Sequence, residues 1–315
     1  MLFVPYKMEY GLARFPWVTS AVCVICLVIF VAQKDSWATL SEAAWSFCAK
    51  PHGPMFKPIL NDLMGSANQQ ACWDLILDIH LAEDPSRYIR DASVEHVRLA
   101  GFDTADSAAY AEGILERTYG KFAATAPVGL SMRLRYVPSS WNPWTMITSS
   151  FAHANWSHIL FNLVFFVAFA ATVESVVGAL VFGGLIIGSS VFTGIWYSAI
   201  SVAVGENIPT LGLSGVVMTM IAVFAFLLPK GKIHCVFWYL PLFHKVPIPA
   251  WILAAFYIGQ DIYYLFMVDY SGSTNFLSHV TGMAFGLLVG VFFLQQAKDY
   301  ARSELKLHRR RAIYT

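Results

Sequence analysis

The chain has 315 residues, of which 57% are hydrophobic and only 13% are charged, and its mean hydropathy is +0.55. Soluble domains are typically about 45–50% apolar and about 25% charged, so this composition excludes an ordinary soluble domain and indicates a membrane protein. The formal net charge of +1 creates no long-range field that would attract nucleic acid. We therefore expect no nucleic-acid partner.

Apolar runs of roughly 20 residues are candidates for membrane-spanning helices. The sequence contains six such runs, of which the fourth is short and begins with glycine-rich sequence. We predict an all-α integral membrane protein built as a bundle of six transmembrane helices. The runs cover approximately residues 16–33, 156–176, 179–200, 213–228, 248–268 and 277–295.

Lysine and arginine near membrane helices gather on the cytoplasmic side. Here they occur before the first run, between the fourth and fifth runs, and in the tail, whereas the loops 201–210 and 269–276 contain none. Six spans place all three basic segments on one side. We therefore expect a multi-pass protein of the bacterial inner membrane with both termini in the cytoplasm. The basic residues are Lys7, Arg14, Lys230, Lys232, Lys245, Lys298, Arg302, Lys306, Arg309, Arg310 and Arg311.

A polar stretch of mixed charge separates the first and second apolar runs, at residues 34–145. Asp84 followed by Pro85 is typical of a helix start, and Gly101 is typical of a helix end. We predict a small, mostly helical extracytoplasmic domain inserted in the first loop. If it faces an oxidising space, Cys48 and Cys72 are candidates for a disulfide.

Polar groups inside a membrane are costly and are therefore candidates for function. At the start of the fourth run, Ser214 lies between Gly212 and Gly215. Small neighbours allow close approach to a serine, and free N–H groups at a helix start can stabilise an oxyanion. Taken alone, this pattern is more typical of a helix-packing face.

The sixth run carries His279. It is followed by Gly282, Gly286 and Gly290, which lie four residues apart from one another. These glycines predict a groove that allows close helix–helix approach. His279 lies one turn before Gly282 on nearly the same face, where it can act as a general base for a serine on the neighbouring helix. The alternative is a core histidine bonded to a backbone group.

The second run begins with His158 and Asn162, which lie four residues apart and share one helical face, shortly after His153. Both side chains can donate hydrogen bonds to an oxyanion. The alternative is hydrogen bonding between helices, with His153 at the membrane interface. Together, the three clusters supply a nucleophile, a base and oxyanion donors at the same end of three helices, which is the set that acyl transfer requires.

These motifs resemble those of the rhomboid intramembrane serine proteases. The resemblance covers roughly residues 141–296 and the first helix, and the ordered set of three motifs is specific. It implies a rhomboid-like bundle with a Ser214–His279 dyad and no third acid. His158, Asn162 and the Ser214 backbone N–H are implied as the oxyanion hole. The motifs are Gly212-x-Ser214-Gly215, His158-x-x-x-Asn162 and His279-x-x-Gly282-x-x-x-Gly286.

The resemblance assigns structural roles to His153 and to Glu174, which matches a glutamate at the cytoplasmic end of the second helix. Many family members have a tyrosine packed on the histidine at the position of Met218. A methionine can contact an imidazole through sulfur but cannot stack on it. Asp261, in the fifth run, is expected near the outer end or bonded to a neighbour, without a catalytic role.

The expected organisation therefore has four parts. Residues 1–33 form the cytoplasmic N-terminus and first helix, 34–145 the inserted domain, 146–297 the rhomboid catalytic core, and 298–315 a basic cytoplasmic tail. The implied activity is an intramembrane serine endopeptidase that cleaves single-span membrane proteins in the lipid bilayer through an acyl-enzyme. No cofactor and no metal are expected, since the sequence has no His-Glu-x-x-His or similar ligand set.

Two other functions remain open. The first is a catalytically inactive rhomboid-like scaffold that binds transmembrane helices, for which Met218 is the one hint. The second is a small transporter or channel, which predicts polar residues at mid-depth on several helices or a repeat between halves. Neither feature is clear in this sequence.

Overall fold

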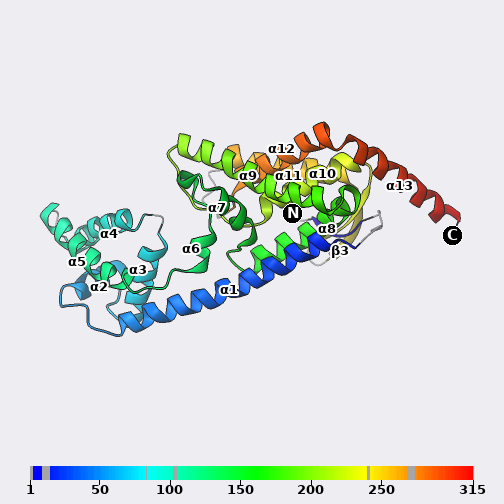
Figure 1. Cartoon of the computed structure of the whole chain (residues 1–315). Coiled ribbons are helices and arrows are strands. Elements are labelled where there is room, and N and C mark those ends of the chain that lie inside the picture. Colours follow the sequence, from blue (N-terminus) through cyan, green and yellow to red (C-terminus); the bar gives the residue numbers. More distant parts are fainter. Residues whose placement is uncertain are drawn as a thin grey trace. The chain divides into compact units, whose positions relative to one another are not determined.

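Helices form most of the chain (Figure 1). The computed structural model describes residues 3–8, 15–82, 84–101, 105–239, 242–267 and 274–314. The chain divides into two compact units. Unit 1 contains Met1–Val31 and Leu134–Thr315, and unit 2 contains Ala32–Arg133.

Unit 1 contains the apolar helices. Five of the described helices are long and apolar enough to cross a membrane, judged by length and composition: α1 (Trp17–Cys48), α8 (Trp156–Val177), α9 (Ala179–Ala203), α11 (Ala250–Met267) and α12 (Phe276–Phe293). The fourth predicted span is α10 (Ser214–Leu227), which has 14 residues. The count of six spans therefore depends on α10 and stays a prediction. The tail forms α13 (Gln295–Tyr314).

Short elements precede α8, and backbone hydrogen bonds of Tyr136 and Ser149 in this segment hold the loop that leads into α10. They are α6 (Leu130–Leu134), η1 (Pro138–Ser140), α7 (Pro143–Thr148) and η2 (Ser149–Phe151). Between α6 and η1, the backbone of Tyr136 exchanges two hydrogen bonds of 2.8 Å with Thr210. This bridge joins the segment before α8 to the segment before α10.

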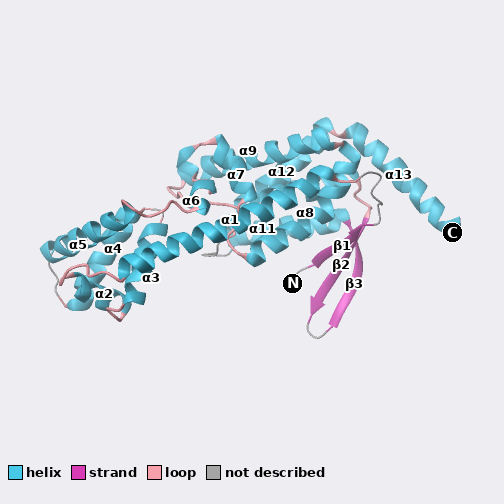
Figure 2. Cartoon of the chain, turned by 60° about the horizontal axis from the view of Figure 1, so that its bottom comes forward, coloured by secondary structure: helices cyan, strands magenta, loops and turns pink. Residues whose placement is uncertain are grey.

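A three-stranded antiparallel sheet is present in unit 1 that the sequence did not predict (Figure 2). Its order is β1 (Phe3–Met8), β2 (Lys232–Tyr239) and β3 (Leu242–Pro249). Val4 lies opposite Val236, which lies opposite Lys245 on its other side. The segment expected to be a basic loop between α10 and α11 is therefore a hairpin, and the N-terminal segment is its third strand.

Unit 2 is helical, with α2 (Phe56–Met64), α3 (Gln69–Leu81), α4 (Pro85–Ala100) and α5 (Ala105–Ala123). The predicted bounds of α4 are confirmed. The Asp84 side chain accepts a hydrogen bond from Arg87 N, and Gly101 ends the helix in the left-handed conformation. Cys48, at the end of α1, forms a disulfide with Cys72 of α3.

The start of α1 is held by a buried carboxylate from α8. Glu174 is 5% exposed, and its two oxygens accept hydrogen bonds from Val18 N at 2.9 Å, Thr19 N at 2.7 Å and Thr19 Oγ1 at 2.7 Å. The first N–H groups of a helix have no partner within that helix, and an anion there also stabilises the helix dipole. Glu174 therefore caps α1 across a large sequence distance.

The Glu174→Gln variant is expected to lower the stability of unit 1 by about 1–3 kcal/mol, because an amide nitrogen cannot accept a hydrogen bond and leaves buried donors unpaired. Thermal unfolding in detergent micelles measures the loss. Asp299→Asn, which removes a carboxylate charge at an exposed position, is the matched control. Equal midpoints for Glu174→Gln and the control would contradict this cap.

Candidate active site

The chain that leads to Ser214 is fixed before α10 begins. Gly212 N donates a 2.8 Å hydrogen bond to Ser149 O, and Gly212 has a φ of 129°, a conformation that favours glycine. Helix α10 then starts at Ser214, and Leu213 at its N-cap offers no side-chain hydrogen bond. The N–H groups of the first turn are therefore not capped by that side chain and are available to an oxyanion.

Helices α10 and α12 contact each other through their backbones. A methyl group added at Gly282 would lie 2.2 Å from the Gly215 carbonyl oxygen, and one added at Gly286 would lie 2.6 Å from the Thr219 carbonyl oxygen. Thr219 Oγ1 also donates a 2.8 Å hydrogen bond to Gly282 O. Because no side chain separates the helices, Ser214 on α10 is held beside the segment of α12 that carries His279.

His158 and Asn162 face Gly212 from α8. A methyl group added at Gly212 would lie 2.7 Å from His158 Nε2 and 3.8 Å from Asn162 Nδ2. His158 Nδ1 accepts a long hydrogen bond of 3.5 Å from Ala154 N, so the ring proton belongs on Nε2, toward Gly212. One N–H of Asn162 donates to His158 O at 3.0 Å, which leaves its second N–H as a donor.

His153 lies behind His158. It is 1% exposed, and the two rings meet edge to face with centroids 5.3 Å apart. Burial, with a further contribution from His158, lowers the pKa of His153 to about 4, so the ring is neutral at pH 7. This arrangement supports the orientation of His158.

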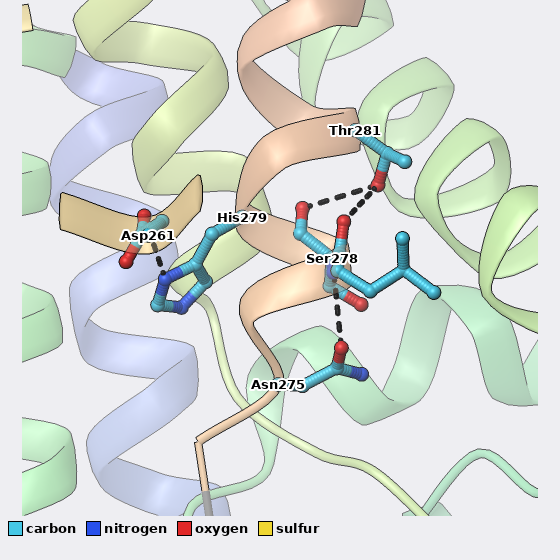
Figure 3. Close-up of polar contacts among 6 residues, drawn as sticks. Asp261, Asn275, Ser278, His279 and Thr281 are labelled. Atoms are coloured by element: carbon cyan, nitrogen blue, oxygen red, sulfur yellow. Dashed lines mark hydrogen bonds and ion pairs between the residues drawn. The ribbon is translucent and has the colours of Figure 1, made fainter. Parts of the chain in front are cut away.

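The His279 ring is held from two sides. Its Nδ1 lies 3.2 Å from Asp261 Oδ2 on α11 (Figure 3), and Phe276 meets it edge to face at a centroid distance of 6.0 Å. The sequence left two expectations for Asp261, a place near the outer end of the helix or a bond to a neighbour, and the structure shows a bond whose partner, His279, was not predicted. A lone carboxylate in an apolar run was the signal that could have indicated a polar partner on another helix.

One cavity of about 540 Å³ joins these groups. Ser214, His279, His158, Asn162 and Met218 all line it. Among the described residues, no hydrogen bond joins the Ser214 hydroxyl to the His279 ring. Catalytic hydrogen bonds are often long or absent in free enzymes and tighten when substrate binds, so a shared cavity is the relevant geometry.

Comparison with known families identifies the part of the chain that holds this cavity. The rhomboid domain family matches residues 140–296. The chain belongs to the rhomboid family. The matched segment contains α8 to α12, and with five helices of membrane-spanning length the chain is a multi-pass integral membrane protein.

Three relatives of this rhomboid protein carry the name presenilin-associated rhomboid-like protein, mitochondrial, from Mus musculus, Bos taurus and Rattus norvegicus. Each is 24% identical over 152 residues, which cover 47% of this chain and 37% of the relative. The chain therefore aligns with well under half of each relative's length. The relatives' names place those proteins in mitochondria and lend no support to the expected bacterial inner membrane.

Among the described residues of unit 2, one group has the composition of a metal site. Ligand atoms of Cys48, His52 and Cys72 all lie within 4.8 Å of one another. Both sulfurs are joined in the disulfide, however, and metal binding to cysteine requires thiolates. With the disulfide formed, these residues do not offer a metal site.

The Gly282→Ala variant is expected to destabilise the rhomboid domain by about 1–3 kcal/mol or more, because its methyl group would overlap the Gly215 carbonyl. Thermal unfolding measures the effect. Gly259→Ala is the matched control, since a methyl group on that helical glycine meets no atom within 4 Å. Identical unfolding of both variants would contradict the close contact of α10 with α12.

Proposed function

We propose that this rhomboid protein is an intramembrane serine endopeptidase that cleaves transmembrane segments of other proteins. The observation that carries the proposal is the single cavity lined by Ser214, His279, His158 and Asn162. A hydroxyl, an imidazole and two side-chain donors in one cavity within an apolar bundle are the components of acyl transfer.

In the proposed reaction, Ser214 Oγ attacks the scissile carbonyl carbon while His279 Nε2 takes the hydroxyl proton. The carbonyl oxygen becomes an oxyanion, which accepts hydrogen bonds from His158 Nε2, Asn162 Nδ2 and the Ser214 backbone N–H. His279 then returns its proton to the leaving amine as the C–N bond breaks. Water, deprotonated by His279, hydrolyses the acyl-enzyme and regenerates Ser214.

The substrates we propose are single-span membrane proteins. A transmembrane helix keeps its carbonyls in internal hydrogen bonds, so a scissile carbonyl becomes accessible only where the helix unwinds. The many polar residues that line the cavity, among them Ser149, Ser190 and Asn275, can receive such an unwound segment. No metal or cofactor takes part in the proposed reaction.

The topology we propose places both termini in the cytoplasm and unit 2 outside it. The charge pattern of the sequence supports this orientation. The sheet adds independent support, because β1 pairs with β2 and so the N-terminal segment and the α10–α11 connection lie on one side. The Cys48–Cys72 disulfide of unit 2 agrees with an oxidising compartment on the other side.

The Ser214→Ala variant tests the activity. In proteoliposomes with a labelled single-span substrate, the wild type is expected to cleave and the variant to fall to the background rate, because the nucleophile is gone. Ser175→Ala is the matched control on α8, where that hydroxyl only bonds Thr172 O of its own helix. A fluorophosphonate is expected to label Ser214 alone. Equal cleavage by wild type and Ser214→Ala contradicts the enzyme, and cleavage by neither favours the scaffold.

Removing either proposed oxyanion donor, by His158→Ala or Asn162→Ala, is expected to lower kcat by about 10²–10³-fold with little change in KM, because these bonds strengthen only in the transition state. Cleavage kinetics separate the two parameters. Leu160→Ala, at an exposed position on the same helix, serves as the control. A loss confined to KM would assign these residues to substrate binding instead.

A further inference from the structure

Asp261 is a buried acid that the proposed reaction leaves without a role. It is 6% exposed and lies in α11, an apolar helix of membrane-spanning length. An ionisable side chain in such a place is costly and is retained where it has a partner or a function. The contact with His279 Nδ1 at 3.2 Å provides the partner (Figure 3).

We propose that Asp261 is a positioning residue for the base, so that the site operates as a Ser214–His279–Asp261 triad in which the carboxylate orients and stabilises the His279 ring. This inference rests on the proposed protease activity and goes beyond the two-residue dyad that the motifs imply. The chain order of the three groups is serine, aspartate, histidine.

An aromatic link between α11 and α12 runs parallel to this contact. Asp261 and Tyr264 lie three residues apart on α11, and Phe276 and His279 lie three residues apart on α12, so each pair shares a helical face. Tyr264 stacks on Phe276 with ring centroids 5.2 Å apart and an interplanar angle of 14°. Phe276 in turn meets the His279 ring edge to face. The aromatic link fixes the rotation of both helices one turn from the polar link.

The carboxylate also determines which nitrogen of His279 can accept a proton as the base. Asp261 Oδ2 accepts a hydrogen bond, so Nδ1 carries the proton and Nε2 keeps its lone pair. A base must present a free lone pair to the hydroxyl that it deprotonates. When Nε2 takes the proton of Ser214, the ring becomes a cation, and the buried carboxylate stabilises that charge without accepting the proton itself.

The isosteric variant Asp261→Asn tests the proposal. It removes the charge but keeps an oxygen that can accept from His279 Nδ1, so a link that only holds α11 to α12 would survive. We expect kcat to fall on the order of 10²-fold while KM and the unfolding midpoint stay near wild type. The rate of fluorophosphonate labelling at Ser214 is expected to fall in parallel.

Gln260→Ala provides the matched control, because Gln260 is the exposed neighbour of Asp261 on the same helix. It is expected to retain wild-type kcat. The proposal is overturned if Asp261→Asn keeps the kcat of the wild type, or if its loss lies only in KM or in the unfolding midpoint.

A measurement on the unaltered protein keeps the proposal testable if the variant fails to fold. Nitrogen-15 NMR of histidine-labelled protein distinguishes the two neutral tautomers, and a difference spectrum against His279→Gln assigns the signal. We expect the Nδ1-protonated tautomer at His279; the Nε2-protonated tautomer overturns the proposal. If the wild type neither cleaves nor reacts with fluorophosphonate, the protease proposal fails, whereas an active wild type with a fully active Asp261→Asn removes only the role of Asp261.

Discussion

The contact of backbone with backbone between α10 and α12 is the constraint on which the site depends. At Gly282 and Gly286 there is no room for even a methyl group between the two helices. A side chain there would force the helices apart and separate the hydroxyl from the imidazole by a comparable amount. Positioning errors of about 1 Å can cost about 10²-fold in rate, so the proposed chemistry depends on the absence of side chains as much as on the presence of Ser214 and His279.

Patterns within single segments of the sequence predicted the features that depend only on residues near one another in the chain. Apolar runs of membrane length gave the long helices, the Asp84 cap and Gly101 gave the bounds of α4, and glycines at four-residue spacing indicated a close helix contact. These features depend on residues near one another in the chain, or on a periodicity that one helix displays by itself.

Contacts between distant segments were not predictable in the same way. The pairing of β1 with β2 places Val4 opposite Val236. The sequence of neither segment indicates with which other segment it pairs. The bond of Asp261 to His279 depends on the rotation and depth of two helices, which hydropathy does not determine. The sequence identified Asp261 as a polar residue in an apolar helix but contained no information on what it faces.

The surroundings of His279 explain how the site accommodates Met218. In many family members a tyrosine at that position packs on the histidine, and here Met218 lines the cavity that His279 also lines. Phe276 contacts the ring instead, from the preceding turn of the same helix, and Asp261 holds Nδ1. The described contacts that hold the proposed base therefore come from α11 and α12, so a change in how α11 packs would alter the orientation of the His279 ring.

The Glu174 cap has a consequence for how the chain assembles. The N–H groups at the start of α1 find their acceptor on a residue more than 150 positions later in the sequence. During synthesis α1 therefore emerges with the N–H groups of Val18 and Thr19 not yet paired with Glu174, and unit 2 follows before α8 exists. Docking of α1 through this cap has to wait for α8, so the start of α1 joins the bundle late although α1 is made before α8.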